Sequence, residues 1–333
     1  MRTELNKDVR AAVAAVSSRE ISHIFLVACG GSVSIMYPGK YLLDRHAQSL
    51  TSDVYNADEF ICREPRQLGE QALVILCSQT GTTKETVAAA RFAREAGATT
   101  IAMTLDAQSP LAAAAEFVVA YQAHYTTGAK IDAADSNYAV LYMLLSGLLA
   151  QRGDTDLVPQ LLQSLSNLQS TIDKAKAFYE PSFDSYAERF RERPVIYTTA
   201  AGANYGAAYS YAICVLMEMQ WINSQAIHAN EFFHGPFEVV DSSASFIALL
   251  GCDETRRIEE RTRDFLVRFG DRNNIMVLDA AELDLSGLEQ PFRGLFAPLI
   301  FFDVLWVFAY RLAALRGQVM LEGRRYMKKI TDY

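Results

Sequence analysis

Apolar segments of strand length recur in this chain at a nearly constant interval. The segment around Ile24 recurs 172 residues later around Ile196, the segment around Ile75 recurs after the same interval, and a third recurs after 174 residues. Two copies of one α/β unit would produce such a repeat. The chain has 333 residues, which is enough for two domains with full hydrophobic cores. The sequence therefore predicts two tandem domains, residues 1–180 and 181–333, with the boundary falling between residues 175 and 190.

Each copy consists of apolar strand-length runs that alternate with helical segments. Ala72–Cys77 is almost wholly apolar, as expected of a parallel strand that is buried on both faces. The pattern predicts α/β domains in which helices flank a parallel sheet, a three-layer sandwich like that of flavodoxin. A helical region is expected over 132–180, with a break at Gly153. The expected strands are 21–28, 51–60, 72–77, 99–105 and 117–121 in the first copy, and 194–199, 245–250 and 275–279 in the second.

Two loops rich in glycine and hydroxyl groups follow strands of the first copy. One is Gly30-Gly31-Ser32, and the other, residues 78–83, reads Ser-Gln-Thr-Gly-Thr-Thr. Open α/β sheets bind ligands at the carboxyl ends of their strands, where backbone N–H groups and helix N-termini attract anions. The hydroxyls could instead cap helices, but a cap needs only one. The pattern favours a phosphate cradle, and the absence of GxGxxG and GxxxxGK[ST] points to a small phosphate ester.

The second copy differs at the equivalent place. Its strand 245–250 is followed by Gly251-Cys252-Asp253-Glu254, whose two carboxylates would repel a phosphate group. The sequence therefore predicts one phosphate site per chain, in the N-terminal half.

A carboxylate and an imidazole near each other in the second copy are candidates for acid–base chemistry. Glu218 lies among Met217, Met219 and Trp221, neighbours that would disfavour its charged form if the side chain were buried, which suits a proton shuttle. His234 precedes Gly235-Pro236, a pair that stops regular structure and can hold an imidazole in place. A solvated glutamate and a structural histidine are the alternatives. The other nearby acids are Glu231 and Glu238.

Composition excludes several classes of protein. The net charge of −8 argues against nucleic acid or an anionic membrane as a partner. Five scattered cysteines without a CxxC motif indicate free thiols in a reducing compartment, and the five histidines form no HxxxH pair that would suggest a metal site. The first residues are charged throughout, unlike a signal peptide, and the longest apolar run, near 295–314, is interrupted by Asp303 and Arg311. We expect a cytoplasmic protein without a metal or organic cofactor.

The ordered set ACGGS, SQTGTTKET and EFFHGP, with a glutamate sixteen residues before the histidine, resembles the sugar isomerase (SIS) superfamily. The resemblance covers nearly the whole chain and implies tandem SIS domains. The stretches YNADEF, AAGANYGAAY, MEMQWI, NEFFHGPFEVVD and RRYMKKITDY look similar to fructosamine-6-phosphate deglycases, of the 6-phosphofructose-aspartate or fructoselysine-6-phosphate type.

The resemblance implies roles for individual residues. It implies Glu218 as the proton-transfer residue, His234 as the acid/base that opens the sugar ring, and a homodimer in which the histidine segment of one subunit reaches the other's site. We expect Glu231 to orient the histidine loop. The residues implied in phosphate binding are Gly31, Ser32, Ser78, Gln79, Thr80 and Thr83.

The implied reaction is cleavage of a phosphorylated fructosamine to glucose 6-phosphate and a free amino acid through an enaminol. Where the aminosugar isomerases of the superfamily have an active-site lysine, three residues before the glutamate, this chain has Val215, which disfavours an isomerase. An aminosugar-phosphate isomerase or deaminase and a non-catalytic sugar-phosphate sensor remain the alternatives. The candidates for binding the amino-acid carboxylate are Arg45, Arg256, Arg257, Arg324 and Arg325.

Overall fold

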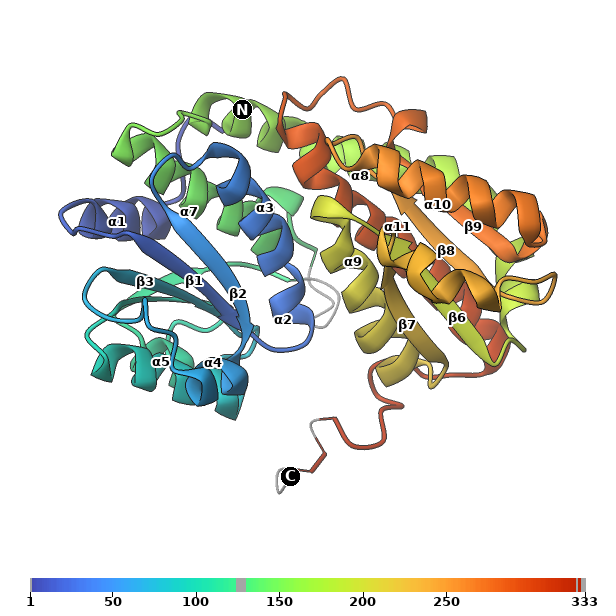
Figure 1. Cartoon of the computed structure of the whole chain (residues 1–333), viewed down its shortest axis with the longest axis horizontal. Helices are drawn as coiled ribbons and strands as arrows, with labels where there is room; N and C mark the ends of the chain where they lie inside the picture. The colour runs from blue at the N-terminus through green and yellow to red at the C-terminus, as the bar shows by residue number, and fades with distance from the viewer. Residues whose placement is uncertain (1, 124–129, 328, 331–333) are drawn as a thin grey trace. The chain divides into compact units, whose positions relative to one another are not determined.

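The computed structural model describes residues 2–123, 130–327 and 329–330. The chain forms two compact units. The first unit comprises the residues up to Gln169 together with Gly287–Phe292, and the second comprises Ser170–Ser286 together with the residues from Arg293 onward. Each unit is built around a parallel sheet flanked by helices (Figure 1), so the predicted fold class is confirmed.

In the described part of the first unit, five parallel strands form a sheet in the order β2-β1-β3-β4-β5. Figure 1 shows α1, α3 and α7 over one face of this sheet and α4 and α5 over the other. The strands are β1 (His23–Ala28), β2 (Thr51–Asn56), β3 (Ala72–Cys77), β4 (Thr99–Thr104) and β5 (Phe117–Ala120), and the helices are α1 (Lys7–Ser17), α2 (Gly31–Ser34), α3 (Met36–His46), α4 (Ala57–Arg63), α5 (Lys84–Glu95), α6 (Pro110–Ala114) and α7 (Asn137–Arg152).

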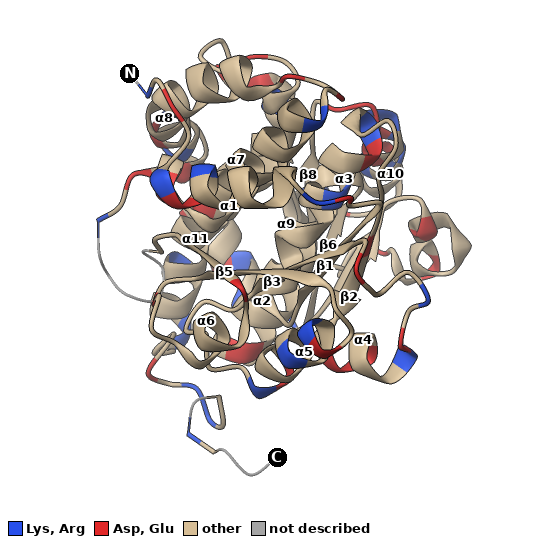
Figure 2. Cartoon of the chain, turned by 90° about the vertical axis from the view of Figure 1, so that its left-hand side faces the viewer, with Lys and Arg blue, Asp and Glu red and all other residues tan. Residues whose placement is uncertain are grey.

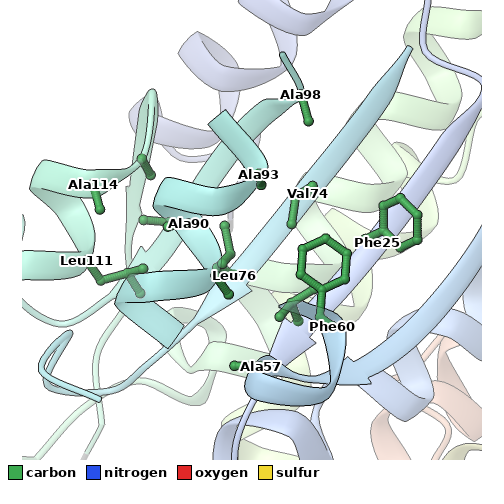
Figure 3. Close-up of a cluster of buried hydrophobic side chains, with 14 of the residues drawn as sticks. Phe25, Ala57, Phe60, Val74, Leu76, Ala90, Ala93, Ala98, Leu111 and Ala114 are labelled. Atoms are coloured by element: carbon green, nitrogen blue, oxygen red, sulfur yellow. The ribbon is translucent and has the colours of Figure 1, made fainter. Parts of the chain in front are cut away.

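A hydrophobic cluster holds α4 and α5 against this sheet (Figure 3). Phe25 of β1 packs against Phe60 of α4 with ring centroids 5.2 Å apart, and Leu76 of β3 and Ala90 of α5 belong to the same buried cluster. Burying a phenylalanine or leucine side chain contributes about 1.5–3 kcal/mol. The alanines of α5 let the helix approach the sheet closely, which fixes the carboxyl ends of β1 and β3 relative to the start of α5.

Most charged residues lie on the helices and loops. Figure 2 shows lysine, arginine, aspartate and glutamate on α3 and α5, whereas β1 and β3 carry none. Every residue of β1, β3 and β4 is buried. These are central strands covered by helices on both faces, which explains the continuous apolar sequence of β3 and the apolar run that follows His23 in β1.

The second unit repeats the first. Among its described residues, four parallel strands follow the order β7-β6-β8-β9, in which β7, β6, β8 and β9 take the places of β2, β1, β3 and β4. The starts of β1 and β6 are 172 residues apart, as are those of β2 and β7. The unit contains α8 (Val158–Phe190, which begins in the first unit), β6 (Val195–Ala200), α9 (Tyr205–Ser210), a π-helix η3 (Tyr211–Met219), β7 (Asn223–His228), β8 (Phe246–Leu250), α10 (Arg256–Phe269), β9 (Ile275–Asp279) and α11 (Phe292–Arg316).

Two sequence expectations about secondary structure are wrong. The strand expected over 51–60 ends at Asn56, and the helix Ala57–Arg63 follows, with Asp58 and Glu59 in its first turn, where acidic residues are favourable. The residues before the histidine motif, where no strand was expected, form strand Asn223–His228. This strand lies at the edge of its sheet and is half exposed, so its sequence is polar.

One helix in the described chain, α11, is long and apolar enough to cross a membrane. However, 78% of its most apolar window is buried inside the protein. The charged residue that interrupts it, Asp303, is itself buried and pairs with Lys176 at 2.7 Å, and Arg311 pairs with Glu180 and Asp184. These are the features of a helix that forms the core of its unit.

Candidate active site

The register of the first sheet brings the two glycine- and hydroxyl-rich loops together. β1 and β3 are neighbours, and their last residues, Ala28 and Cys77, are directly paired. Neighbouring strands lie about 4.8 Å apart, so the loops that leave these two residues begin side by side. The Ser32 hydroxyl of the first loop hydrogen-bonds the Cys77 thiol at the end of β3. Burial raises the pKa of this thiol to about 11, so it stays neutral at physiological pH.

Two hydroxyls of the second loop bond each other instead of capping a helix. Thr83 occupies the N-cap position of α5 but makes no side-chain cap hydrogen bond, and its Oγ1 lies 2.9 Å from Oγ of buried Ser78. The bond between two hydroxyls uses only one of their two hydrogens. The other hydrogen is therefore available to an additional acceptor at the mouth of α5, which is what a phosphate oxygen requires.

Hydrogen bonds and a close approach at Gly81 fix the conformation of the rest of the second loop. The Gln79 carbonyl accepts from the Leu105 N–H at 3.0 Å, and the exposed Thr80 hydroxyl bonds that of Thr82 at 2.7 Å. Gly81 has φ +64°, and a Cβ at this position would lie 2.1 Å from Oγ of Ser109. Only glycine fits there. The loop is thus held in one conformation before any ligand arrives.

The first loop faces open space. Gly30 has φ +54°, ψ −131°, a conformation that other residues avoid, and a Cβ added to it would meet no atom within 4 Å. Gly31 and Ser32 begin the short helix α2 immediately after it. The structure thus brings the predicted cradle residues of both loops to one edge of the first sheet, with room beside Gly30. We call this group of residues, 30–32 and 78–83, the cradle.

Glu218 lies on a π-helix in the second unit. It is the penultimate residue of Tyr211–Met219, and π-helical turns are rare and often occur at functional sites. Its Oε1 accepts from Nη1 of Arg324 at 2.9 Å, and the two side chains are only 18% and 20% exposed. The sequence reasoning placed Glu218 in an apolar setting. In the structure Met217 is exposed to solvent, and the Glu218 carboxylate has the Arg324 guanidinium as its partner.

The turn after Glu218 is strained and supported by the C-terminal segment. Trp221 has φ +56°, which is uncommon for a non-glycine residue, and it directs the chain from the π-helix into β7. The guanidinium of Arg325 lies 3.8 Å from the centroid of its ring, a cation–π contact. Gln318 donates to the Met219 carbonyl at 2.9 Å. Three residues of the C-terminal segment that follows α11 therefore contact the end of the π-helix and the turn after it: Gln318, Arg324 and Arg325.

His234 is exposed on a short helix with an aromatic base. It ends the 3₁₀ helix Glu231–His234, and Gly235 follows with φ +135°. Phe232 of this helix is fully buried and packs edge-on against Phe265 of α10. Phe232 therefore anchors the segment to its own unit, while His234 stays accessible to solvent.

Sequence reasoning missed one imidazole in this region. His228 ends β7, is half-buried, and its ring lies 5.4 Å from that of Tyr205. Its Nδ1 accepts from the Asn230 N–H at 3.2 Å, and burial lowers its pKa. Glu231, expected to orient the histidine loop, accepts from the Asn230 side chain at 3.4 Å. His228 could have been recognised from the sequence as a candidate only if β7, the strand that it ends, had been predicted.

One arginine considered for carboxylate recognition has a structural role. Arg256 donates to both carboxylate oxygens of Asp279, at 2.6 and 2.9 Å, and to the Gly251 carbonyl. Such a bidentate pair is already satisfied. Arg324 and Arg325, by contrast, contact the Glu218 region.

Comparison with known proteins places the chain in a family. The family model of the SIS domain matches residues 19–147, which include the whole cradle. The chain is 47% identical to the fructosamine deglycase FrlB of Bacillus subtilis (strain 168), over 98% of both chains. It is 29% identical to the fructoselysine 6-phosphate deglycase of Escherichia coli (strain K12), over 98% of this chain and 91% of that protein.

Two solved structures agree over the whole length. A Bacillus subtilis protein described as a phosphosugar isomerase superposes with a TM-score of 0.93 at 47% identity, covering 98% of each chain. A Salmonella typhimurium LT2 protein with the same description gives a TM-score of 0.91 at 33% identity, covering 99% of this chain and 98% of the other. The chain therefore belongs to the family of SIS-domain enzymes that includes these deglycases.

Proposed function

We propose that this enzyme is a fructosamine-6-phosphate deglycase. Its substrate would be a 1-amino-1-deoxyfructose 6-phosphate whose nitrogen belongs to an amino acid, and its products glucose 6-phosphate and the free amino acid. The observation that carries this proposal is the 47% identity with the Bacillus subtilis fructosamine deglycase over nearly the whole of both chains. We further propose that it acts in the cytoplasm as a homodimer, with neither nucleic acid nor a membrane as a partner.

The cradle would bind the substrate's phosphate. The Ser78 and Thr83 hydroxyls, the backbone around Gly31 and Ser32, and the start of α5 offer neutral donors to an anion. Gln79 and Thr80 complete the loop. Because the loop is already held in one conformation by its own hydrogen bonds, little ordering free energy is lost when the phosphate binds.

Glu218 and His234 would carry out the proton transfers. His234 assists opening of the furanose ring, and Glu218 removes a proton from C1, giving an enaminol whose C1–C2 double bond lies beside the nitrogen. Return of the proton to C2 gives the imine of glucose 6-phosphate. Water then adds to C1 and the C1–N bond breaks, releasing the amino acid. Each general acid–base step of this kind contributes typically about 10²–10⁴-fold.

Arg324 supports the role of Glu218. A proton-transferring carboxylate must be held in a fixed orientation, and the Arg324 guanidinium holds one of its oxygens at 2.9 Å. The second oxygen, Oε2, is the one we assign to the substrate's C1 proton.

The experiment is turnover of a panel of fructosamine 6-phosphates, carrying aspartate, lysine, glutamine or glutamate, with glucose 6-phosphate as the measured product. We expect release of glucose 6-phosphate from at least one member of the panel. For Glu218→Gln we expect the rate to fall by about 10²-fold or more. In D₂O, protonation of the enaminol should place deuterium at C2 of the product. Transfer of the C1 hydrogen to C2 without deuterium would mean that the proton on Glu218 returns before it exchanges with solvent, and Glu218→Gln should then abolish that transfer.

The alternatives give different outcomes in the same assay. An aminosugar-phosphate isomerase or deaminase would act on glucosamine 6-phosphate and leave the fructosamine panel unchanged. A sugar-phosphate sensor would bind the panel without turning it over. Either result would overturn the proposed deglycase activity.

A further inference from the structure

The second unit contains a buried carboxylate surrounded by N–H donors. Glu259 of α10 is only 2% exposed. Its Oε1 accepts from the Ala201 N–H at 3.0 Å and from Nδ2 of Asn204 at 3.3 Å, and its Oε2 accepts from the Gly251 N–H at 2.6 Å. A carboxylate is removed from water at high cost unless donors of this kind replace its hydration. Nothing in the proposed reaction uses Glu259.

The two backbone donors lie at the ends of neighbouring strands. Ala201 directly follows β6, and Gly251 directly follows β8, with β6 and β8 paired in register. In the first unit the equivalent strands are β1 and β3, which are followed by Cys29 and Ser78. The Glu259 carboxylate thus occupies, within its own unit, the strand edge that carries the cradle in the first unit.

The loops in the two units share a backbone form but differ in what faces them. Gly30 and Gly202 each lie two residues beyond their strand, with φ of +54° and +51°. A Cβ on Gly30 would meet no atom within 4 Å, whereas a Cβ on Gly202 would lie 2.3 Å from Oγ1 of Thr255. Thr255 precedes α10 as Thr83 precedes α5. The same turn is therefore open in the first unit and closed in the second.

We propose that the second unit retains an oxyanion site built like the cradle, that the Glu259 carboxylate fills it permanently, and that removal of this carboxylate lets a small oxyanion bind in its place. The likeness to the cradle rests on the proposed phosphate site of the first unit. The three donors around Glu259 do not depend on it. The site explains why a repeated chain would bind one phosphate: the second position is occupied by the protein itself.

The charges around the site set the expected affinity. Asp253 lies beside Gly251, its Oδ1 accepts from the Thr255 N–H and hydroxyl, and its charge opposes a second anion. The Arg256 guanidinium already pairs with Asp279, so it offsets only part of the negative charge of Asp253. Burial, with a contribution from Asp253, raises the pKa of Glu259 to about 8. An external oxyanion should therefore bind less tightly than it would without the charge of Asp253.

The test uses the full chain and two replacements of one side chain. Glu259→Ala removes the carboxyl group and leaves space, whereas Glu259→Gln keeps the site filled with a group that cannot ionise. Both are made in a Ser78→Ala/Thr83→Ala background, to weaken the cradle. Thermal unfolding is followed with increasing inorganic phosphate or acetate, and hydrogen exchange of peptides covering 201–204 and 250–252 locates the binding.

We expect phosphate or acetate at several times its Kd to raise the Tm of the Ala variant by about 2–4 °C more than that of the Gln variant. Protection of the two peptides should rise in the Ala variant alone. Equal Tm shifts in the two variants with both anions would overturn the proposal. If the Ala variant folds only in the presence of either anion, that result supports it, and failure of both anions to restore a fold that the Gln variant keeps overturns it.

The test of the Glu259 site gives a result that is independent of the phosphate assignment to the cradle. If phosphate stabilises the Ser78→Ala/Thr83→Ala background as strongly as the unmodified chain, the cradle assignment fails. The difference between the Ala and Gln variants at Glu259 would still decide the second site.

Discussion

The guanidinium of Arg324 lies 2.9 Å from the carboxylate of Glu218, although 106 residues separate the two in the chain. The contact links the C-terminal segment to the π-helix that presents the proposed proton-transfer residue. Both side chains are mostly buried, so solvent weakens their interaction less than it would on an open surface.

Arg324→Gln should lower kcat by about 10–100-fold, because a hydrogen bond between charged groups is worth about 1.5–3 kcal/mol. Arg324 acts through Glu218, so Glu218→Gln/Arg324→Gln should be no slower than Glu218→Gln alone. Arg324→Lys should recover part of the rate. Arg325→Gln is the matched control, since this neighbour contacts Trp221 and not the carboxylate. Losses that simply add in the double variant would show that Arg324 has a separate function.

Ser78→Ala/Thr83→Ala should raise KM for a fructosamine 6-phosphate at least about 10-fold, because each lost bond to a charged group is worth about 1.5–3 kcal/mol. The same fructosamine without phosphate should react equally slowly with the variant and the unmodified enzyme. Ser17→Ala, which removes an exposed hydroxyl from α1, serves as the control. A KM that stays within twofold of the original would place the phosphate elsewhere.

Mixing His234→Ala with Glu218→Gln should restore about a quarter of the original activity per total site, if two subunits share each site. With free exchange, half the dimers are mixed, and each mixed dimer has one intact and one doubly damaged site. Subunit exchange is verified with two affinity tags. If exchange occurs and the mixture remains as inactive as its parents, each histidine serves its own subunit.

The stability of the chain should depend on Glu259 between pH 4.5 and pH 8. Burial raises the folded-state pKa to about 8 from an ordinary value of 4.5. The folded state therefore holds this proton more tightly than the unfolded state. The contribution of Glu259 to the free energy of unfolding is therefore largest below pH 4.5 and falls as the pH rises to 8, by roughly 4 kcal/mol.

Glu259→Gln cannot titrate, so its stability relative to the unmodified chain should rise over the same pH interval. Other titrating groups, including His228, are present in both proteins and cancel in the difference. The measurement is urea unfolding of both at several pH values. A stability difference independent of pH would mean that the N–H donors around Glu259 hold it ionised throughout.

The pattern of apolar residues was enough to predict the repeat and the bounds of two strands. Ala72–Cys77 was predicted with its observed bounds, because a strand buried on both faces needs continuous apolar residues. The bounds of the edge strand Ile275–Asp279 were also predicted, from its apolar run. The glycines and hydroxyls after the first and third strands could be placed at one site, because the carboxyl ends of parallel strands meet at one edge of a sheet.

Only the tertiary structure decided what each polar group contacts. β7 is an edge strand with one neighbour, so its polar sequence carried no clear strand pattern. The partner of Glu218 is distant in the chain, and the pairing of Ser78 with Thr83 in place of a helix cap depends on the loop's conformation. Glu259 looks like a solvated helix residue in the sequence. Its burial follows from the docking of α10 against the ends of β6 and β8, which no local pattern encodes.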